Sequence, residues 1–129
     1  MVLVVALALA APACPQVVPL PAWTTQVGQA EAAFAARDEA AFDAAMTHLA
    51  DDLSCLDAVL EPALAGRYHR LIGLRLYARG DQEGARLAFA AARTVDPFGA
   101  LPSELLPAGH EARELSVTAS TPGTLASRV

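Results

Sequence analysis

Three side chains in the middle of the chain, His48, Asp52 and Cys55, have a spacing at which neighbouring turns of a helix could share a metal ion. Cys55, however, lies beyond the expected end of that helix, and no second His-rich motif supplies further ligands. We therefore expect these residues to bind no metal.

Nucleophilic catalysis is not expected either. Acidic residues flank Cys55 and disfavour its thiolate, the form that attacks a substrate. Ser54 and Ser103 lack the glycine-framed elbow of serine hydrolases, and the sequence has no Gly-rich phosphate-binding loop. We expect a protein that is not an enzyme and needs no cofactor.

The two cysteines, Cys14 and Cys55, allow three interpretations. A small residue precedes Cys14, as in bacterial lipoproteins, which makes this cysteine a candidate for lipidation and for the only contact with a membrane that we expect. Alternatively, the two cysteines form a disulfide, which an exported location would permit. In the third interpretation, Cys55 is a small buried apolar residue without a partner.

Residues 1–13, MVLVVALALAAPA, predict a signal for export. The apolar run is shorter than the ~20 residues needed to span a membrane, but it has the length of a signal-peptide core and ends in small residues. We expect an exported, periplasmic or outer-membrane-associated bacterial protein with a Pro-rich linker over 14–22. The alternative is a buried apolar N-terminal helix.

The composition predicts a single all-α domain. The length of 129 residues fits one domain, and 30 of these residues are alanine, the best helix former. The net charge of −5 argues against a nucleic-acid partner, because binding to phosphates requires a basic surface.

Apolar residues recur every three or four positions over four segments, which predicts four helices. We expect them at 25–36, 39–53, 62–79 and 82–95. They would form two antiparallel hairpins over 23–115, a short α-solenoid. We expect a leucine-rich cap at 101–106, a short helix at 110–115, and disorder from 116 to 129.

The stretch 69–97 resembles a tetratricopeptide repeat, a helix–turn–helix unit of about 34 residues. His69 stands where the repeat usually has a large residue such as Trp. The remaining signature positions are in register: Ile72, Gly73, Leu76, Gly80, Ala85, Phe89, Ala92 and Pro97. In this pattern small residues let the two helices approach, and Phe89 fills the gap between them.

The resemblance implies a scaffold or adaptor that binds a protein or peptide in a groove lined by the first helix of each hairpin. The candidate contacts on the second hairpin are Arg67, His69, Arg70 and Arg75. The alternative is a structural spacer or self-assembling subunit of a larger envelope complex, for which Cys14 is the candidate lipid anchor. A third hypothesis is a fragment whose missing C-terminal domain carries the activity.

Charge is divided along the chain. Residues 23–61 carry a net charge of −7 and residues 62–95 a net charge of +4. The two halves could neutralise each other within the molecule, or the arginines could form a surface for an acidic peptide. We favour the first interpretation.

Overall fold

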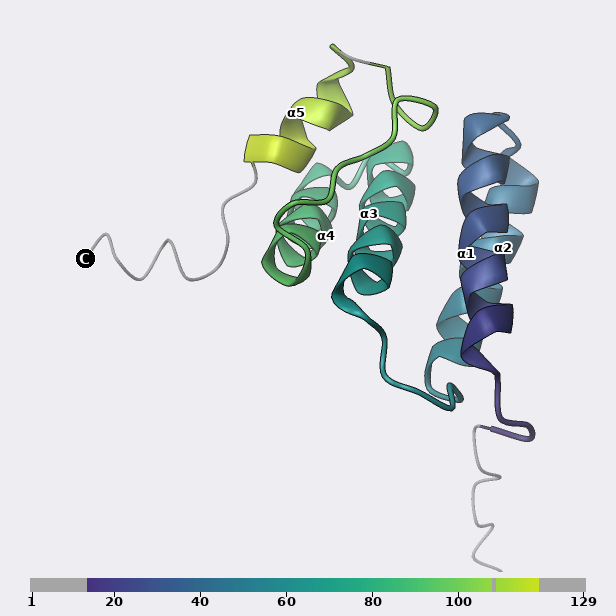
Figure 1. Cartoon of the computed structure of the whole chain (residues 1–129). Coiled ribbons are helices and arrows are strands. Elements are labelled where there is room, and N and C mark those ends of the chain that lie inside the picture. Colours follow the sequence, from purple (N-terminus) through teal and green to yellow (C-terminus); the bar gives the residue numbers. More distant parts are fainter. Residues whose placement is uncertain (1–13, 108, 119–129) are drawn as a thin grey trace, which may run out of the picture.

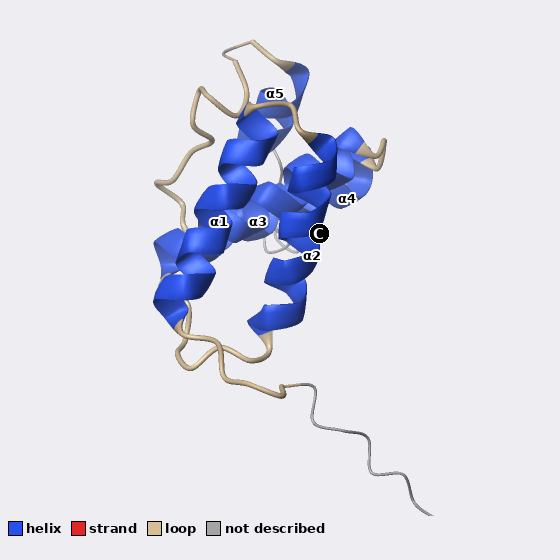
Figure 2. Cartoon of the chain, turned by 90° about the vertical axis from the view of Figure 1, so that its right-hand side faces the viewer, coloured by secondary structure: helices blue, strands red, loops and turns tan. Residues whose placement is uncertain are grey.

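The computed structural model describes residues 14–107 and 109–118, and the predicted signal segment and residues 119–129 lie outside these ranges. The described residues form helices and loops without a strand, which confirms the all-α class (Figures 1 and 2). In chain order the helices are α1 (Leu20–Ala35), α2 (Glu39–Leu53), α3 (Pro62–Ala78), α4 (Gln82–Val95) and α5 (Glu111–Thr118). No helix within these ranges is long and apolar enough to cross a membrane.

The first four helices pack as two successive pairs. Helix α1 lies against α2, and α3 lies against α4 (Figure 1). Helix α3 also contacts both helices of the first pair. Each pair, residues 20–53 and 62–95, spans 34 residues. Helix α5 packs on α4 and, less extensively, on α3.

Two helix limits differ from the prediction by more than one residue. Helix α1 begins at Leu20 instead of residue 25, because Pro21 is favourable in a first helical turn, so residues 20–22 belong to the helix and not to a linker. Helix α5 continues to Thr118, so residues 116–118 are helical and not part of a disordered tail. The predicted limits of α2 and α4 agree with the structure.

The turn between α1 and α2 ends one helix and begins the next within three residues. The Asp38 N–H donates to the Ala33 carbonyl at 3.0 Å, a bond that closes the end of α1. The Asp38 carboxylate then accepts from the Ala41 N–H at 3.1 Å and caps α2. Arg37, directly before Asp38, has a φ of 60°, in the left-handed region that favours glycine.

The turn between α3 and α4 repeats this structure. The Asp81 N–H donates to the Leu76 carbonyl at 2.9 Å, and the Asp81 carboxylate accepts from the Gly84 N–H at 2.9 Å. Here Gly80, with a φ of 83°, supplies the left-handed residue. Arg37 therefore takes the place in the first turn that Gly80 takes in the second.

Replacing Arg37 with glycine should stabilise the protein. Glycine adopts the left-handed conformation without the steric cost of a Cβ atom, so we expect the free energy of unfolding to rise by about 1 kcal/mol. Urea denaturation followed by circular dichroism measures this change. Gly80→Arg in the second turn is the matched reverse variant and should lower the free energy of unfolding by a similar amount; an unchanged R37G would contradict the expectation.

The second pair packs closely because Gly73 faces Phe89. A Cβ atom built on Gly73 would lie 2.6 Å from the Phe89 ring, and that ring is only 1% exposed. The ring cannot yield without disturbing the core, so the absence of a side chain at position 73 allows the two helices to approach.

Gly73→Ala is therefore expected to lower the free energy of unfolding by about 1–3 kcal/mol through overpacking. Gly28→Ala is the matched control, since Gly28 also lies inside a helix and a Cβ there would meet nothing within 4 Å. The control should gain up to about 1 kcal/mol from alanine's helix propensity. Equal effects of G73A and G28A in urea denaturation would show that the predicted clash does not matter.

The segment after α4 covers the end of the core. Leu101, Leu105 and Leu106 are buried in the main hydrophobic cluster, so the predicted leucine cap is confirmed. Arg113 of α5 holds this segment by donating to the Leu101 carbonyl at 2.9 Å and to the Leu106 carbonyl.

The N-terminal segment 14–19 is attached to the loop between the helix pairs. Cys14 and Cys55 form a disulfide with a Cα–Cα distance of 5.3 Å. The Val18 N–H donates to the Cys55 carbonyl at 2.8 Å, and the Asp57 carboxylate accepts from the Leu20 N–H at 3.0 Å, which caps α1. The segment is thus attached to the fold and is not a free linker.

Of the three interpretations of the cysteines, the structure contains the disulfide. Lipidation of Cys14 would require the sulfur that is bonded to Cys55, so the lipid-anchor candidate does not fit this structure. Cys55 is buried, as the third interpretation expected, but it has a covalent partner.

Candidate functional site

A half-open pocket of about 330 Å³ lies where the two helix pairs meet the segment that follows α4. Its volume falls in the range of ligand-binding pockets. The walls come from the turn between α1 and α2, the C-terminal half of α3, and the segment before α5. The lining residues are Phe34, Arg37, Asp38, Glu39, Phe42, Leu74, Tyr77, Ala78, Leu106 and His110.

The pocket is largely apolar and aromatic. The rings of Phe34 and Phe42 contact edge to face with their centroids 5.1 Å apart. On the other side, the centroids of Tyr77 and His110 are 6.0 Å apart. The His110 ring is held in place because its Nδ1 accepts from the Ala112 N–H at 3.1 Å.

Charged side chains also line the pocket. Arg37 and Asp38 of the turn between α1 and α2, and Glu39 at the start of α2, are exposed. The Glu111 carboxylate faces the Tyr77 hydroxyl; partial desolvation and this carboxylate together raise the pKa of Tyr77. With one guanidinium and three carboxylates, the surroundings of the pocket are negatively charged.

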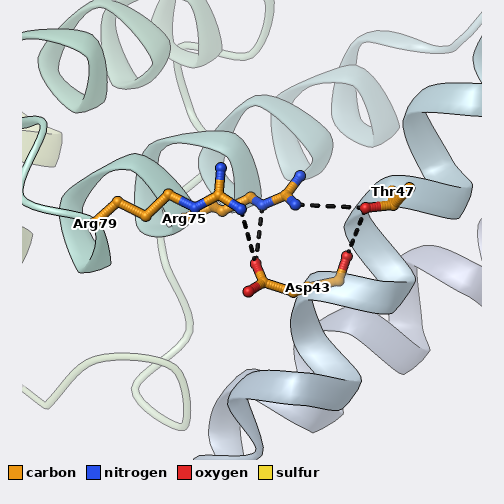
Figure 3. Close-up of polar contacts among 4 residues, drawn as sticks. All are labelled: Asp43, Thr47, Arg75 and Arg79. Atoms are coloured by element: carbon orange, nitrogen blue, oxygen red, sulfur yellow. Dashed lines mark hydrogen bonds and ion pairs between the residues drawn. The ribbon is translucent and has the colours of Figure 1, made fainter.

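The arginines predicted to bind a partner form ion pairs within the chain. Arg67 pairs with Glu31, an interaction that raises the pKa of Arg67. Arg75 lies 3.0 Å from the Asp43 carboxylate and also donates to the Thr47 hydroxyl, as Figure 3 shows.

Arg79 adds a second guanidinium to Asp43 at 3.3 Å (Figure 3). These pairs join the basic α3 to the acidic first helix pair, which favours internal neutralisation over an arginine surface for an acidic peptide. Because the pairs are partly exposed, each contributes about 0–1 kcal/mol.

Arg70 and His69 also interact with other residues of the chain. The Arg70 side chain is only 8% exposed and pairs with Asp96 at 2.9 Å. His69 is partly buried beside Tyr68, and its burial lowers the pKa of the imidazole. Neither residue lines the aromatic pocket.

A shallow groove lies between the N-terminal ends of α1 and α3, the first helices of the two pairs. Arg67 lines it, whereas Arg70, Arg75 and His69 do not. The other lining residues are Leu20, Pro21, Thr24, Glu61, Ala63 and Leu64.

The repeat-signature residues lie mainly inside the second helix pair. Gly73, Ala85, Phe89 and Ala92 are buried. Ile72 and Leu76 pack on the core from partly buried positions, Gly80 forms the turn, and Pro97 follows α4 on the surface.

The pocket could not be predicted from the sequence, because its walls come from separate parts of the chain. Phe34 and Phe42 flank a turn whose left-handed residue, Arg37, lacks the glycine signal of the second turn. The sequence contains one indication that the first pair follows the plan of the second. An aspartate, Asp38 or Asp81, precedes the second helix of each pair and caps it.

The described residues contain no group of three or more His, Cys, Asp or Glu side chains arranged to hold a metal ion. In particular, the sulfur of Cys55 is bonded to Cys14 and is not available to join His48 and Asp52 as a ligand. Comparisons with protein-family models, curated proteins and solved structures found no match.

Proposed function

We propose that this chain is a non-enzymatic, tetratricopeptide-like interaction module of an exported bacterial protein, which binds a protein partner. The observation that carries the proposal is the aromatic pocket, which opens to the surface where both helix pairs and the C-terminal cap meet. An exposed concave site with apolar walls and a few polar groups is suited to a segment of another molecule.

The repeat-like plan supports the proposal. Two helix pairs of 34 residues follow each other, and each has the same turn with a left-handed residue before a capping aspartate, Asp38 or Asp81. Stacked helix pairs of this length form short solenoids, whose surfaces bind proteins. The transfer from architecture to function is by analogy.

The proposal can be tested by affinity capture of the tagged chain from its own host, without reductant. The blocking variant is Ala78→Phe, because Ala78 lines the pocket from an exposed position at the end of α3. Ala44→Phe, on an exposed part of α2 away from the pocket, is the matched control. A stoichiometric partner retained by A44F and lost by A78F would support the proposal, whereas equal capture by both variants would contradict it.

A self-assembling subunit is the second candidate. It is favoured by Phe98, an aromatic side chain that is 99% exposed just after α4. Aromatic residues are enriched in the cores of protein–protein interfaces. Sedimentation of the wild type and of Phe98→Ser over a range of concentrations would test it: a wild-type oligomer that F98S disrupts supports self-assembly, and a monomer in both cases excludes it.

A further inference from the structure

Building on the proposed function, we infer that the aromatic pocket accommodates the side chain of a lysine or arginine residue of the partner protein. The inference combines the apolar and aromatic walls of the pocket with the negative charge around it. Neither feature alone specifies the occupant, but together they match a long side chain with a hydrocarbon stem and a cationic end.

The walls suit such a side chain. The partly buried Phe34 and Tyr77 and the exposed Ala78 offer apolar surface on which methylene groups can pack, whereas Leu74 and Leu106 line the pocket but are only 1% and 2% exposed. Aromatic rings also attract a cation, and two partly exposed rings, Phe34 and Tyr77, line the pocket. An uncharged apolar side chain would use only the first of these properties.

The charges favour a cation. Asp38 and Glu39 line the pocket, and Glu111 lies beside the Tyr77 hydroxyl. Arg37 opposes them with a single positive charge. The balance is negative, so an ammonium or guanidinium group is attracted and a carboxylate is repelled.

The rest of the charge distribution agrees with a basic partner. Five arginines form ion pairs with carboxylates of the same chain: Arg67, Arg70, Arg75, Arg79 and Arg86. An acidic partner would have to compete with these pairs. The chain as a whole carries a net charge of −5, which speeds the approach of a basic segment.

Nuclear magnetic resonance titration of the intact, disulfide-bonded chain tests the inference with three probes. They are the Nα-acetyl methylamides of lysine, of norleucine, which has the same hydrocarbon length without the charge, and of glutamate. We expect the lysine probe to give saturable shifts at the amides of Glu39, Tyr77 and His110, with an affinity at least about threefold above that of norleucine.

Two variants that each remove one charge should act in opposite directions. Glu39→Gln should weaken binding of the lysine probe by about threefold, and Arg37→Gln should strengthen it by a similar factor. Asp51→Asn, which removes one exposed negative charge on α2 outside the pocket, is the control for net charge and should change the affinity little. An equal effect of E39Q and D51N would overturn a local role for Glu39.

Other outcomes would overturn the inference and identify what replaces it. Equal affinity for norleucine and lysine would show an apolar site, whereas tighter binding of glutamate, with reversed effects of E39Q and R37Q, would show an anion site. The absence of saturable shifts at the pocket with any probe would also refute it. If A78F still abolished capture of a host partner in any of these cases, the proposed function would stand and only the nature of the occupant would be wrong.

Discussion

Replacing Trp23 with alanine is expected to lower the free energy of unfolding by about 3–5 kcal/mol, a large fraction of the stability of a small domain. Trp23 is fully buried and joins three helices. From α1, its Nε1 donates to the Leu49 carbonyl of α2 at 3.1 Å, and its ring contacts the Tyr68 ring of α3 with centroids 5.1 Å apart. Its removal would leave a cavity between the two helix pairs.

The measurement is urea denaturation followed by far-ultraviolet circular dichroism, since the variant lacks the only tryptophan. Trp23→Phe retains most of the ring contact and loses the hydrogen bond, so we expect a smaller loss of about 1–2 kcal/mol. Leu87→Ala, at a side chain that is 59% exposed on α4, is the control and should change stability by less than about 0.5 kcal/mol. If W23A cost no more than L87A, Trp23 would not hold the helix pairs together.

Local signals in the sequence predicted the helices better than their assembly. The starts of α2 and α4 follow from Asp38 and Asp81, because an aspartate directly before an apolar periodic stretch caps a helix without help from distant residues. The start of α1 was predicted five residues late. Pro21 is a local signal for this start, but the Asp57 carboxylate that accepts from the Leu20 N–H lies 37 residues further along the chain, and no local pattern reveals that contact.

The contacts of the candidate site were likewise not predictable from local sequence. The sequence correctly indicated that α3 is rich in arginine. The count of arginines does not show whether their side chains face solvent or carboxylates. Asp43 accepts from both Arg75 and Arg79, which lie 32 and 36 residues further along the chain, so the outcome depends on how the two helix pairs pack. The pocket was not predictable for this reason: Phe34, Tyr77 and His110 meet only in the folded chain.

Loss of the disulfide is expected to have an effect of comparable size. Cys14 and Cys55 are 41 residues apart, and in the chain-entropy description a bond across a loop of this length stabilises the fold by about 4 kcal/mol. The double variant Cys14→Ser/Cys55→Ser should therefore lose about 2–4 kcal/mol in urea denaturation without reductant. The native protein should also move towards the stability of the variant when a reductant is added.

The variant itself is the control for the reductant, since the double serine chain should be insensitive to it. Thiol titration of the denatured native protein provides an independent measurement and should detect no free thiol. A lipid on Cys14 would instead leave Cys55 titratable and raise the mass of the chain by that of the lipid, so the same sample distinguishes the disulfide from the anchor.

If the disulfide is present, segment 14–19 stays attached to α1 through Asp57 and Cys55. The aromatic pocket, lined by the turn at the other end of α1, would then remain free for a partner.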